Sequence, residues 1–237
     1  MPPPRPARKA APLDTTSQDT KSRILDAAEH LFMEHGFEAT SLRSLTAAAS
    51  VNLAAVNYHF GSKEELFQAV LTRRLDAMNQ ERIDLLSKLE REAGERPVAC
   101  EKILSAMLIP ALRLARDEKR GGKNFLRLLG RAYADPAPFI RTFLSEQYAD
   151  MIGRFKEAFL KSLPHLTRQE LTWRLHFVMG ALSYTLAGTD VLKLIAHALP
   201  GEKDNDELLL QRLAPFLVAG LKAPLGDVRK LELVSGI

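Results

Sequence analysis

Residues 39–66 carry the pattern that most constrains the fold of this chain. The segment opens with a short helical pattern over residues 41–49, in which Leu42, Leu45 and Ala49 share one face. The side chains around this face are mostly small alanines, so another helix can approach it closely. The pattern therefore predicts a short helix that packs through a single face.

A second short helix is predicted over residues 53–60. Asn52 directly precedes it, and asparagine is a favourable N-cap because its side-chain oxygen accepts a backbone N–H of the first turn. Val56 and Phe60 lie one turn apart and form the face that packs on the preceding helix. The opposite face is left for a partner and consists of Ala54, Asn57 and Tyr58.

Gly61 ends this second helix, and Ser62 with Glu65 forms a capping box for a third. Two short helices joined by a tight turn form a helix-turn-helix, whose second helix can present side chains to base edges in the major groove of DNA. Flanking donors then contact the phosphates. The candidate DNA-contacting residues are Thr40, Arg43, Asn52, Leu53, Ala54, Ala55, Asn57, Tyr58, His59 and Lys63.

The same segment resembles the DNA-binding signature of the tetracycline-repressor (TetR) family of bacterial regulators. The resemblance includes an Ala-Thr-Ser opening, a Leu-x-x-Ala-Ala core, Val51, the triplet at 58–60 and Gly-Ser-Lys-Glu-Glu-Leu at 61–66. Three positions depart from the family pattern, which commonly has Gly at Ser50, an aromatic residue at Asn57, and polar-Gly-Thr at 53–55. Fewer direct donors to bases remain, so base readout is expected to be modest, with methyl contacts to thymine.

Composition and hydrophobic periodicity predict an all-α chain, because Ala and Leu dominate and no alternating β pattern occurs. The predicted organisation is a disordered basic, Pro-rich tail at 1–19, a DNA-binding domain at 20–66, a helical effector-binding and dimerisation domain at 67–224, and a tail at 225–237. The predicted helices are 19–35, 63–93, 97–118, 123–134, 138–163, 167–188, 189–199 and 205–222.

Two of these helices, 171–187 and 207–221, are apolar on nearly all sides. A helix of this kind is covered on two faces, either inside one subunit or by a second subunit. A dimer interface is favoured, because a two-fold dimer reads both half-sites of a palindromic operator. The segments 173–182 and 219–224 also resemble a fatty-acid-responsive (PsrA-like) branch of the family.

The resemblance implies a ligand-gated switch, with a pocket inside the C-terminal helices. A Met and Phe stripe at helical spacing is more often plain core, but four Phe and one Met over residues 138–160 suit an adaptable apolar site. The candidate lining residues are Met107, Phe125, Phe143, Met151, Phe155, His176 and Phe177, with Phe139 and Phe159 beside them. Candidate polar anchors are Arg127, Arg131, Tyr148 and His176. The expected effector is apolar and of acyl type, such as a fatty acid or acyl-CoA.

Other classes of protein are less well supported by the sequence. Residues 1–63 hold seven Lys and Arg against six Asp and Glu, which argues against an architectural protein that binds DNA by charge alone. There is no phosphate-binding loop, nucleophile elbow or paired-His motif, so catalysis is not expected. The single cysteine, Cys100, rules out an internal disulfide and a Cys-based zinc site, and no metal or cofactor is expected. Without an apolar run or signal segment, a cytoplasmic protein with no membrane contact is expected.

Overall fold

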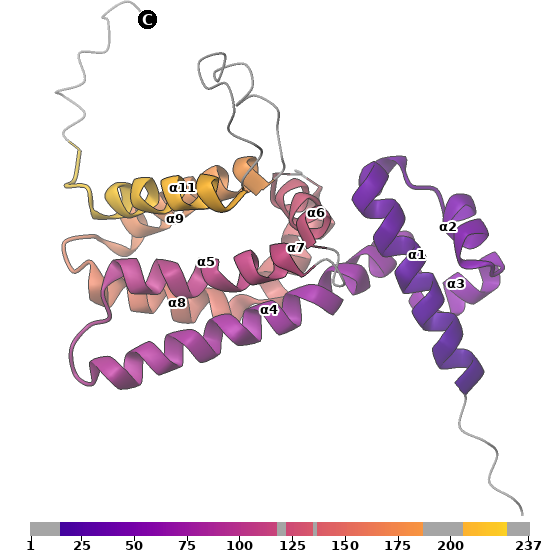
Figure 1. Cartoon of the computed structure of the whole chain (residues 1–237), viewed down its shortest axis with the longest axis horizontal. Coiled ribbons are helices and arrows are strands. Elements are labelled where there is room, and N and C mark those ends of the chain that lie inside the picture. The colour runs from indigo at the N-terminus through magenta and orange to yellow at the C-terminus, as the bar shows by residue number, and fades with distance from the viewer. Residues whose placement is uncertain (1–14, 118–121, 135–136, 187–205, 227–237) are drawn as a thin grey trace, which may run out of the picture. The chain divides into compact units, whose positions relative to one another are not determined.

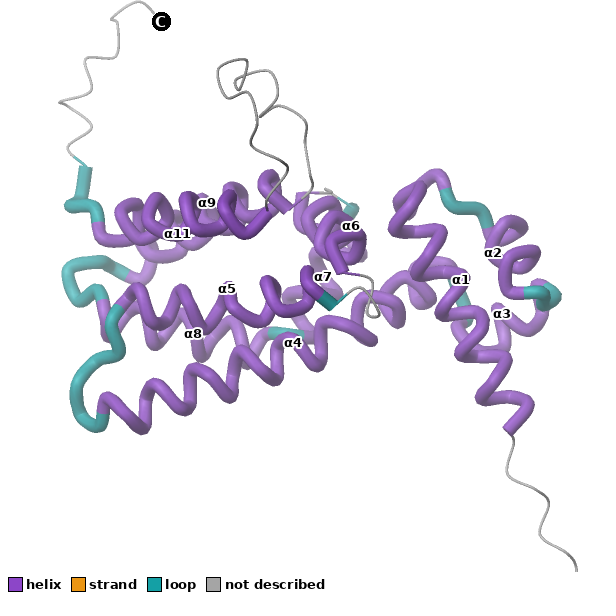
Figure 2. The backbone as a smooth tube through the Cα atoms, viewed as in Figure 1, coloured by secondary structure: helices purple, strands orange, loops and turns teal. Residues whose placement is uncertain are grey.

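The computed structural model describes residues 15–117, 122–134, 137–186 and 206–226, and every regular element among them is a helix (Figures 1 and 2). The helices are α1 (Thr15–Ala39), α2 (Leu42–Ala49), α3 (Leu53–Phe60), α4 (Lys63–Ala93), α5 (Cys100–Arg116), α6 (Gly122–Ala134), α7 (Pro138–Gln147), α8 (Ala149–Ser162), α9 (Arg168–Leu186) and α11 (Asp206–Lys222). The all-α prediction is therefore confirmed. The helix predicted at 189–199 lies outside the described residues.

The chain divides into two compact units, the first ending at Val70 and the second beginning at Leu71. The first unit contains α1, α2, α3 and the start of α4. The second contains the rest of α4 and the helices that follow. No described helix is long and apolar enough to cross a membrane.

Helix α1 begins at Thr15, earlier than the sequence predicts. Residues 15–19, which composition places in the N-terminal tail, are helical instead. Arg23 lies 3.9 Å from the carboxylate of Asp19 one turn earlier, and such a pair supports a helix that starts before Asp19. The predicted end of the helix after His35 coincides with a kink inside α1, because Gly36 leaves helical geometry with a φ of +82° and residues 37–39 form a further helical turn.

The core of the first unit forms around α1, from which Ile24, Ala28 and Phe32 are buried. The Phe32 ring meets Phe67 of α4 edge-on, with ring centroids 5.0 Å apart. Phe37 directly follows the kink at Gly36 and packs against the same Phe67 ring, with ring centroids 5.1 Å apart. These aromatic contacts hold the start of α4 against α1.

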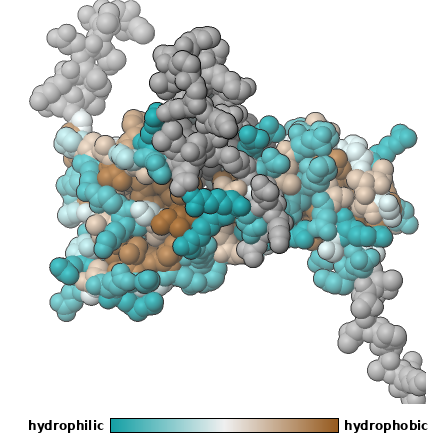
Figure 3. All heavy atoms as spheres, viewed as in Figure 1, coloured by the Kyte–Doolittle hydropathy of each residue, from teal (hydrophilic) through white to brown (hydrophobic). Residues whose placement is uncertain are grey.

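The second unit is a helical bundle whose core is formed mainly by α5, α8, α9 and α11. Its most deeply buried side chains include Ile103, Phe159, Leu171 and Leu221. Figure 3 shows hydrophobic residues gathered along α5, between α11 and α4, with hydrophilic residues around them.

The single helix predicted over 138–163 is wrong, because it is two helices, α7 and α8, that meet at Tyr148. Tyr148 has φ −115° and ψ 19°, and its side chain is buried. Its hydroxyl donates a hydrogen bond to the Asp76 carboxylate of α4 at 3.0 Å. The apolar spacing continues across the break, so the sequence pattern alone gives no sign of it.

Candidate DNA-binding face and ligand cavity

Helix α2 begins at a capping box formed by Ser41 and Ser44. The Ser44 backbone N–H donates to the Ser41 hydroxyl at 3.0 Å, and the Ser41 N–H donates to the Ser44 hydroxyl at 3.2 Å. Leu45 and Ala49 are buried, as the predicted packing face requires. The helix is therefore fixed at its start by local hydrogen bonds and along its length by one apolar face.

The turn between α2 and α3 passes through Ser50 in a left-handed conformation, with φ 52° and ψ 48°. The Ser50 N–H donates to the Ala47 carbonyl at 3.2 Å, and the Val51 N–H donates to the Thr46 carbonyl at 3.0 Å. This is the position at which the family pattern commonly has glycine, the residue that adopts a left-handed backbone most readily. The tight turn therefore forms here without glycine.

Helix α3 has the two faces that the sequence predicts. Asn52 caps it by accepting the Ala55 N–H at 2.9 Å, and Val56 and Phe60 are buried. The predicted readout residues lie on the other side, with Leu53 49% and Tyr58 81% exposed. The remaining candidates on this helix are Ala54 and Asn57, which are exposed, and Ala55 and His59, which are half-buried.

The turn after α3 is set by Gly61 and a second capping box. Gly61 has a φ of +75°, and a Cβ there would collide with the Glu65 carboxylate. That carboxylate accepts the Ser62 N–H at 2.9 Å, while the Ser62 hydroxyl accepts the Glu65 N–H at 3.0 Å. The predicted capping box at the start of α4 is thus confirmed.

Thr40 does not fit the role of a phosphate contact through its side chain. It is 1% exposed, and its hydroxyl donates to the carbonyl oxygens of Gly36 at 2.7 Å and Leu31 at 3.2 Å. The hydroxyl instead satisfies backbone carbonyls that α1 leaves without partners at its end. Sequence position placed Thr40 near α2, but the packing of α1 decides where its side chain points.

Of the two candidate phosphate-binding cations, Arg43 is exposed on α2 with no side-chain hydrogen bond or ion pair among the described residues. Lys63 is half-buried, and its ammonium donates to the Glu38 carbonyl at 3.4 Å and lies 4.3 Å from the centre of the Phe37 ring. An ammonium has three donors, so Lys63 keeps capacity for a phosphate while also bracing the end of α1.

The second unit contains a cavity of about 530 Å³ bounded by α4, α5, α6, α7, α8 and α9. Most of its lining is apolar, and its volume lies in the range of small-molecule sites. Four of the predicted lining residues, Met107, Met151, Phe155 and His176, border this cavity. Phe159 and Tyr148 also border it.

Three predicted lining residues do not border the cavity. Phe125 is fully buried in the core, and Phe143 is half-buried with its ring edge-on to Tyr148 at 6.3 Å. Phe177 is 64% exposed on another side of α9. Three further candidates also lie outside the lining, namely Phe139, Arg127 and Arg131. Helical spacing identified apolar residues but not the side on which a cavity would open.

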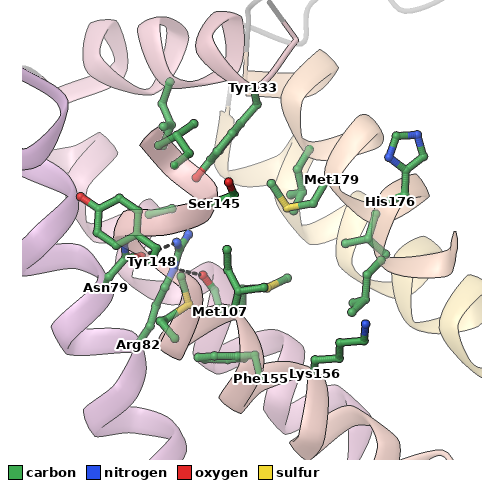
Figure 4. Close-up of a pocket in the computed structure, with 18 of the residues that line it drawn as sticks. Asn79, Arg82, Met107, Tyr133, Ser145, Tyr148, Phe155, Lys156, His176 and Met179 are labelled. Atoms are coloured by element: carbon green, nitrogen blue, oxygen red, sulfur yellow. Dashed lines mark hydrogen bonds between the residues drawn. The ribbon is translucent and has the colours of Figure 1, made fainter. Parts of the chain in front are cut away.

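Several polar residues that line the cavity were not predicted from the sequence, and Arg82 is the most informative of them. Its Nε donates to the Met107 carbonyl at 2.9 Å, and its Nη1 donates to the Asn79 side-chain oxygen at 2.8 Å (Figure 4). Burial lowers the pKa of Arg82, and the nearby Tyr133 phenol opposes that shift. The charged run that contains Arg82 predicts a solvent-exposed stretch, and no local signal turns this one side chain inward. The other polar residues missed are Asn79, Tyr133, Arg141, Ser145 and Lys156.

Exposed aromatic side chains on α9 and α11, two helices that pack against each other, make up an aromatic surface. Its large members are exposed, with Trp173 at 55%, Phe177 at 64% and Phe216 at 69%. The Trp173 and Phe177 rings stack with centroids 6.2 Å apart. Burial of these residues inside one protomer, the alternative to a dimer interface, is therefore wrong. The opposite side of α9 is buried through Leu171, Val178 and Leu182.

A helix-turn-helix with an outward second helix, followed by an all-helical unit, defines a DNA-binding regulator of transcription. The chain belongs to the TetR family: the family model described as "Bacterial regulatory proteins, tetR family" matches residues 24–70, and that of the "Tetracyclin repressor-like, C-terminal domain" matches residues 105–220. The members compared are transcriptional regulators, so the expectation that the protein is not an enzyme is confirmed.

Curated relatives match over a part of the chain only. The regulator UidR of Escherichia coli is 36% identical over 59 residues, which span 25% of this chain and 30% of the relative. The regulator TtgR of Pseudomonas putida is 32% identical over 88 residues, 37% of this chain and 40% of the relative. The chain thus covers well under half of either relative.

Solved structures extend the likeness to the whole fold. The fatty acid degradation regulator FadR from Bacillus halodurans aligns with a TM-score of 0.54 at 17% identity, covering 91% of this chain and 99% of that one. NalD, the secondary repressor of the MexAB-OprM efflux pump in Pseudomonas aeruginosa, aligns with a TM-score of 0.53 at 22% identity, covering 89% and 100%. At these identities the likeness concerns the fold alone.

Proposed function

We propose that the protein is a homodimeric repressor that binds a palindromic operator and is released from it by a small apolar effector of acyl type. The observation that carries the DNA-binding part is the division of α3 into two faces. Val56 and Phe60 are buried, whereas Leu53, Asn57 and Tyr58 face outward. An exposed face of this kind on the second helix of a helix-turn-helix meets base edges in the major groove.

The roles of the candidate residues follow from their chemistry. Asn57 can pair with adenine through its amide, and the methyl groups of Leu53, Ala54 and Ala55 can contact thymine. Tyr58 belongs with Ala54 and Asn57 to the face proposed to read bases. Arg43, His59 and Lys63 are proposed to contact phosphates, which fix register without carrying sequence information. Asn52 contributes mainly by capping α3, and the Thr40 side chain is left out of the contact set because it is buried.

The exposed aromatic surface of α9 and α11 supports the proposal that the protein is a dimer. One helix-turn-helix reads only a few base pairs, so a two-fold dimer is needed to engage two half-sites. Trp173, Phe177 and Phe216 form an exposed apolar patch of the kind that marks an interface. We place the partner protomer on this surface.

The cavity in the second unit supports the proposal of a small-molecule effector. Its volume and apolar lining suit a small molecule with a hydrocarbon part, and the methionines in its wall can adapt to different shapes. Ligand binding would favour protein conformations with low affinity for the operator, which is a population shift. Helix α4 is the element that contributes residues both to the first unit and to the cavity.

The proposal is tested by selecting bound sequences from a random DNA pool with the purified full chain. We expect an enriched palindromic motif with two half-sites, and sedimentation of its complex as two protomers per site. Binding that shows no sequence preference and falls steeply with salt would instead indicate an architectural protein. A motif with only one half-site would contradict the proposed dimer but would still support a sequence-specific regulator.

A further inference from the structure

The charged side chains around the cavity are all of one sign. Arg82, Arg141 and Lys156 line it, and none of its lining residues in the described chain is an aspartate or glutamate. His176 adds an imidazole that can donate a hydrogen bond. The remaining wall is mostly aliphatic, aromatic or methionine. An apolar chamber that carries only positive charge favours a negatively charged ligand.

Arg82 is the cation placed best to hold such a ligand. Its hydrogen-bond partners are the Met107 carbonyl, the Asn79 amide oxygen and the Tyr133 phenol, and none of these is a carboxylate. Among the described residues it forms no ion pair with a carboxylate. Figure 4 shows the guanidinium beside Asn79 and Tyr148 on one side of the cavity, with Lys156 and His176 on the other. The contacts to the Met107 carbonyl and the Asn79 amide fix the orientation of the guanidinium without neutralising its charge.

Arg82 is half-buried, so its guanidinium has lost part of its hydration without gaining an ion pair. A carboxylate bound there would supply the missing opposite charge. The planar fork of arginine matches a carboxylate and forms short charge-assisted hydrogen bonds with it. A long hydrocarbon chain attached to that carboxylate can lie along Phe155, Met151 and Met179 in the rest of the cavity wall. Cationic amphiphiles, in contrast, meet like charge at Arg82 and Lys156.

We infer that the cavity binds an anionic amphiphile, a single-chain carboxylate whose head group lies on Arg82 and whose tail fills the apolar chamber. This inference rests on the proposed role of the cavity as the effector site. It narrows that role from apolar molecules in general to acids. It places the free acid ahead of its coenzyme A thioester, which carries its charge on the distant phosphates of the coenzyme and not at the end of the hydrocarbon chain.

The experiment compares head groups on one hydrocarbon chain. Dodecanoate, methyl dodecanoate, dodecyltrimethylammonium and dodecanoyl-coenzyme A are titrated into the full chain below their micelle concentrations, by calorimetry and by fluorescence. The single tryptophan, Trp173, reports binding because its ring lies 6.1 Å from that of the cavity residue His176. We expect dodecanoate to bind at least about 10-fold more tightly than each of the other three.

The variant R82Q should weaken dodecanoate binding by about 10- to 100-fold and leave the affinity for methyl dodecanoate unchanged. The matched control is R154Q, which removes a half-buried arginine of α8 that pairs with Glu90 at 2.6 Å outside the cavity lining. It should leave both affinities unchanged. If R82Q fails to fold, R82K keeps the charge, and the head-group series on the unmodified chain still decides the matter.

Equal affinity for all four head groups would overturn the assignment of Arg82 but leave an apolar effector in place. If dodecanoyl-coenzyme A bound more tightly than dodecanoate, the proposal that the head group lies on Arg82 would be wrong. If none of the four binds, both this inference and the effector part of the proposed function fail. Operator binding by the same preparation, measured by fluorescence anisotropy, tests the DNA-binding part separately.

Discussion

The Arg174 guanidinium of α9 donates a hydrogen bond of 2.9 Å to the carbonyl oxygen of Leu221 in the last turn of α11. The same guanidinium also donates to the carbonyls of Gly220, Ala223 and Pro224. Carbonyls at the end of a helix have no partner within the helix, and a cation also complements the negative end of its dipole. Arg174 therefore ties α11 to α9, the two helices that carry the exposed aromatic surface.

Replacing Arg174 with methionine should lower the free energy of unfolding by roughly 2 kcal/mol, because charge-assisted hydrogen bonds in a buried position are lost. Urea titration followed by circular dichroism measures this change. The matched control is R168M, on the same helix, where an exposed arginine pairs with Glu157. An exposed pair contributes less than about 1 kcal/mol, so equal losses in the two variants would contradict the capping role of Arg174.

Replacing Asn57 with alanine should relax discrimination at one base-pair position in each half-site by roughly 1–3 kcal/mol, because a bidentate amide contact to a base is lost. Asn57 is exposed on α3 and touches no part of the unit core, so the fold should be unaffected. The measurement is competition binding against operators that carry single substitutions. An equal loss of affinity for all of these operators would indicate that Asn57 contacts the DNA phosphates and not a base.

Replacing Lys63 with alanine should weaken binding to every DNA sequence alike and reduce the slope of log affinity against log salt by about 1. Because Lys63 also contacts the Glu38 carbonyl and the Phe37 ring, a loss of stability of about 0.5 kcal/mol should accompany it. R43A gives the comparison, since Arg43 has no such contacts and should change the salt slope without changing stability. An unchanged slope in K63A would make Lys63 a structural residue only.

Replacing Phe177 with lysine should convert the dimer into a monomer, because a charge would have to be buried in an apolar interface. Operator affinity should fall with it, since two linked half-site contacts become single ones. Sedimentation velocity and anisotropy measure the two effects. A dimeric F177K would place the interface elsewhere.

The stability of the protein should fall between about pH 9 and pH 11 through Cys100. Its side chain is 1% exposed, and burial raises the pKa of the thiol to about 11. A pKa raised by folding contributes stability that is present while the thiol is protonated in both states and is lost as pH rises through the folded value. The difference in unfolding free energy between the native chain and C100A, followed from pH 8 to 11, isolates this effect.

At neutral pH the same thiol should resist iodoacetamide until the protein unfolds, since the reactive species is the thiolate. Rapid alkylation of the folded protein would show that Cys100 is accessible.

The local features of the first unit could be predicted from the sequence. Asn52, Ser62 and Glu65 cap their helices through neighbours only a few residues away, and such contacts depend little on the rest of the chain. The burial of Val56 and Phe60 follows from helical spacing in the same way. The two faces of α3, and with them the family and the class of protein, were therefore determined by the sequence itself.

The cavity and the charges that line it were decided only by the tertiary structure. Spacing marks Phe125, Phe155 and Phe177 as equally apolar, yet one fills the core, one lines the cavity and one is exposed. The inward turn of Arg82 and the break at Tyr148 depend on partners in other helices, Met107 and Asp76. The sequence pattern shows that a helix has an apolar face, but whether that face meets core, cavity or a second protomer depends on how distant helices pack.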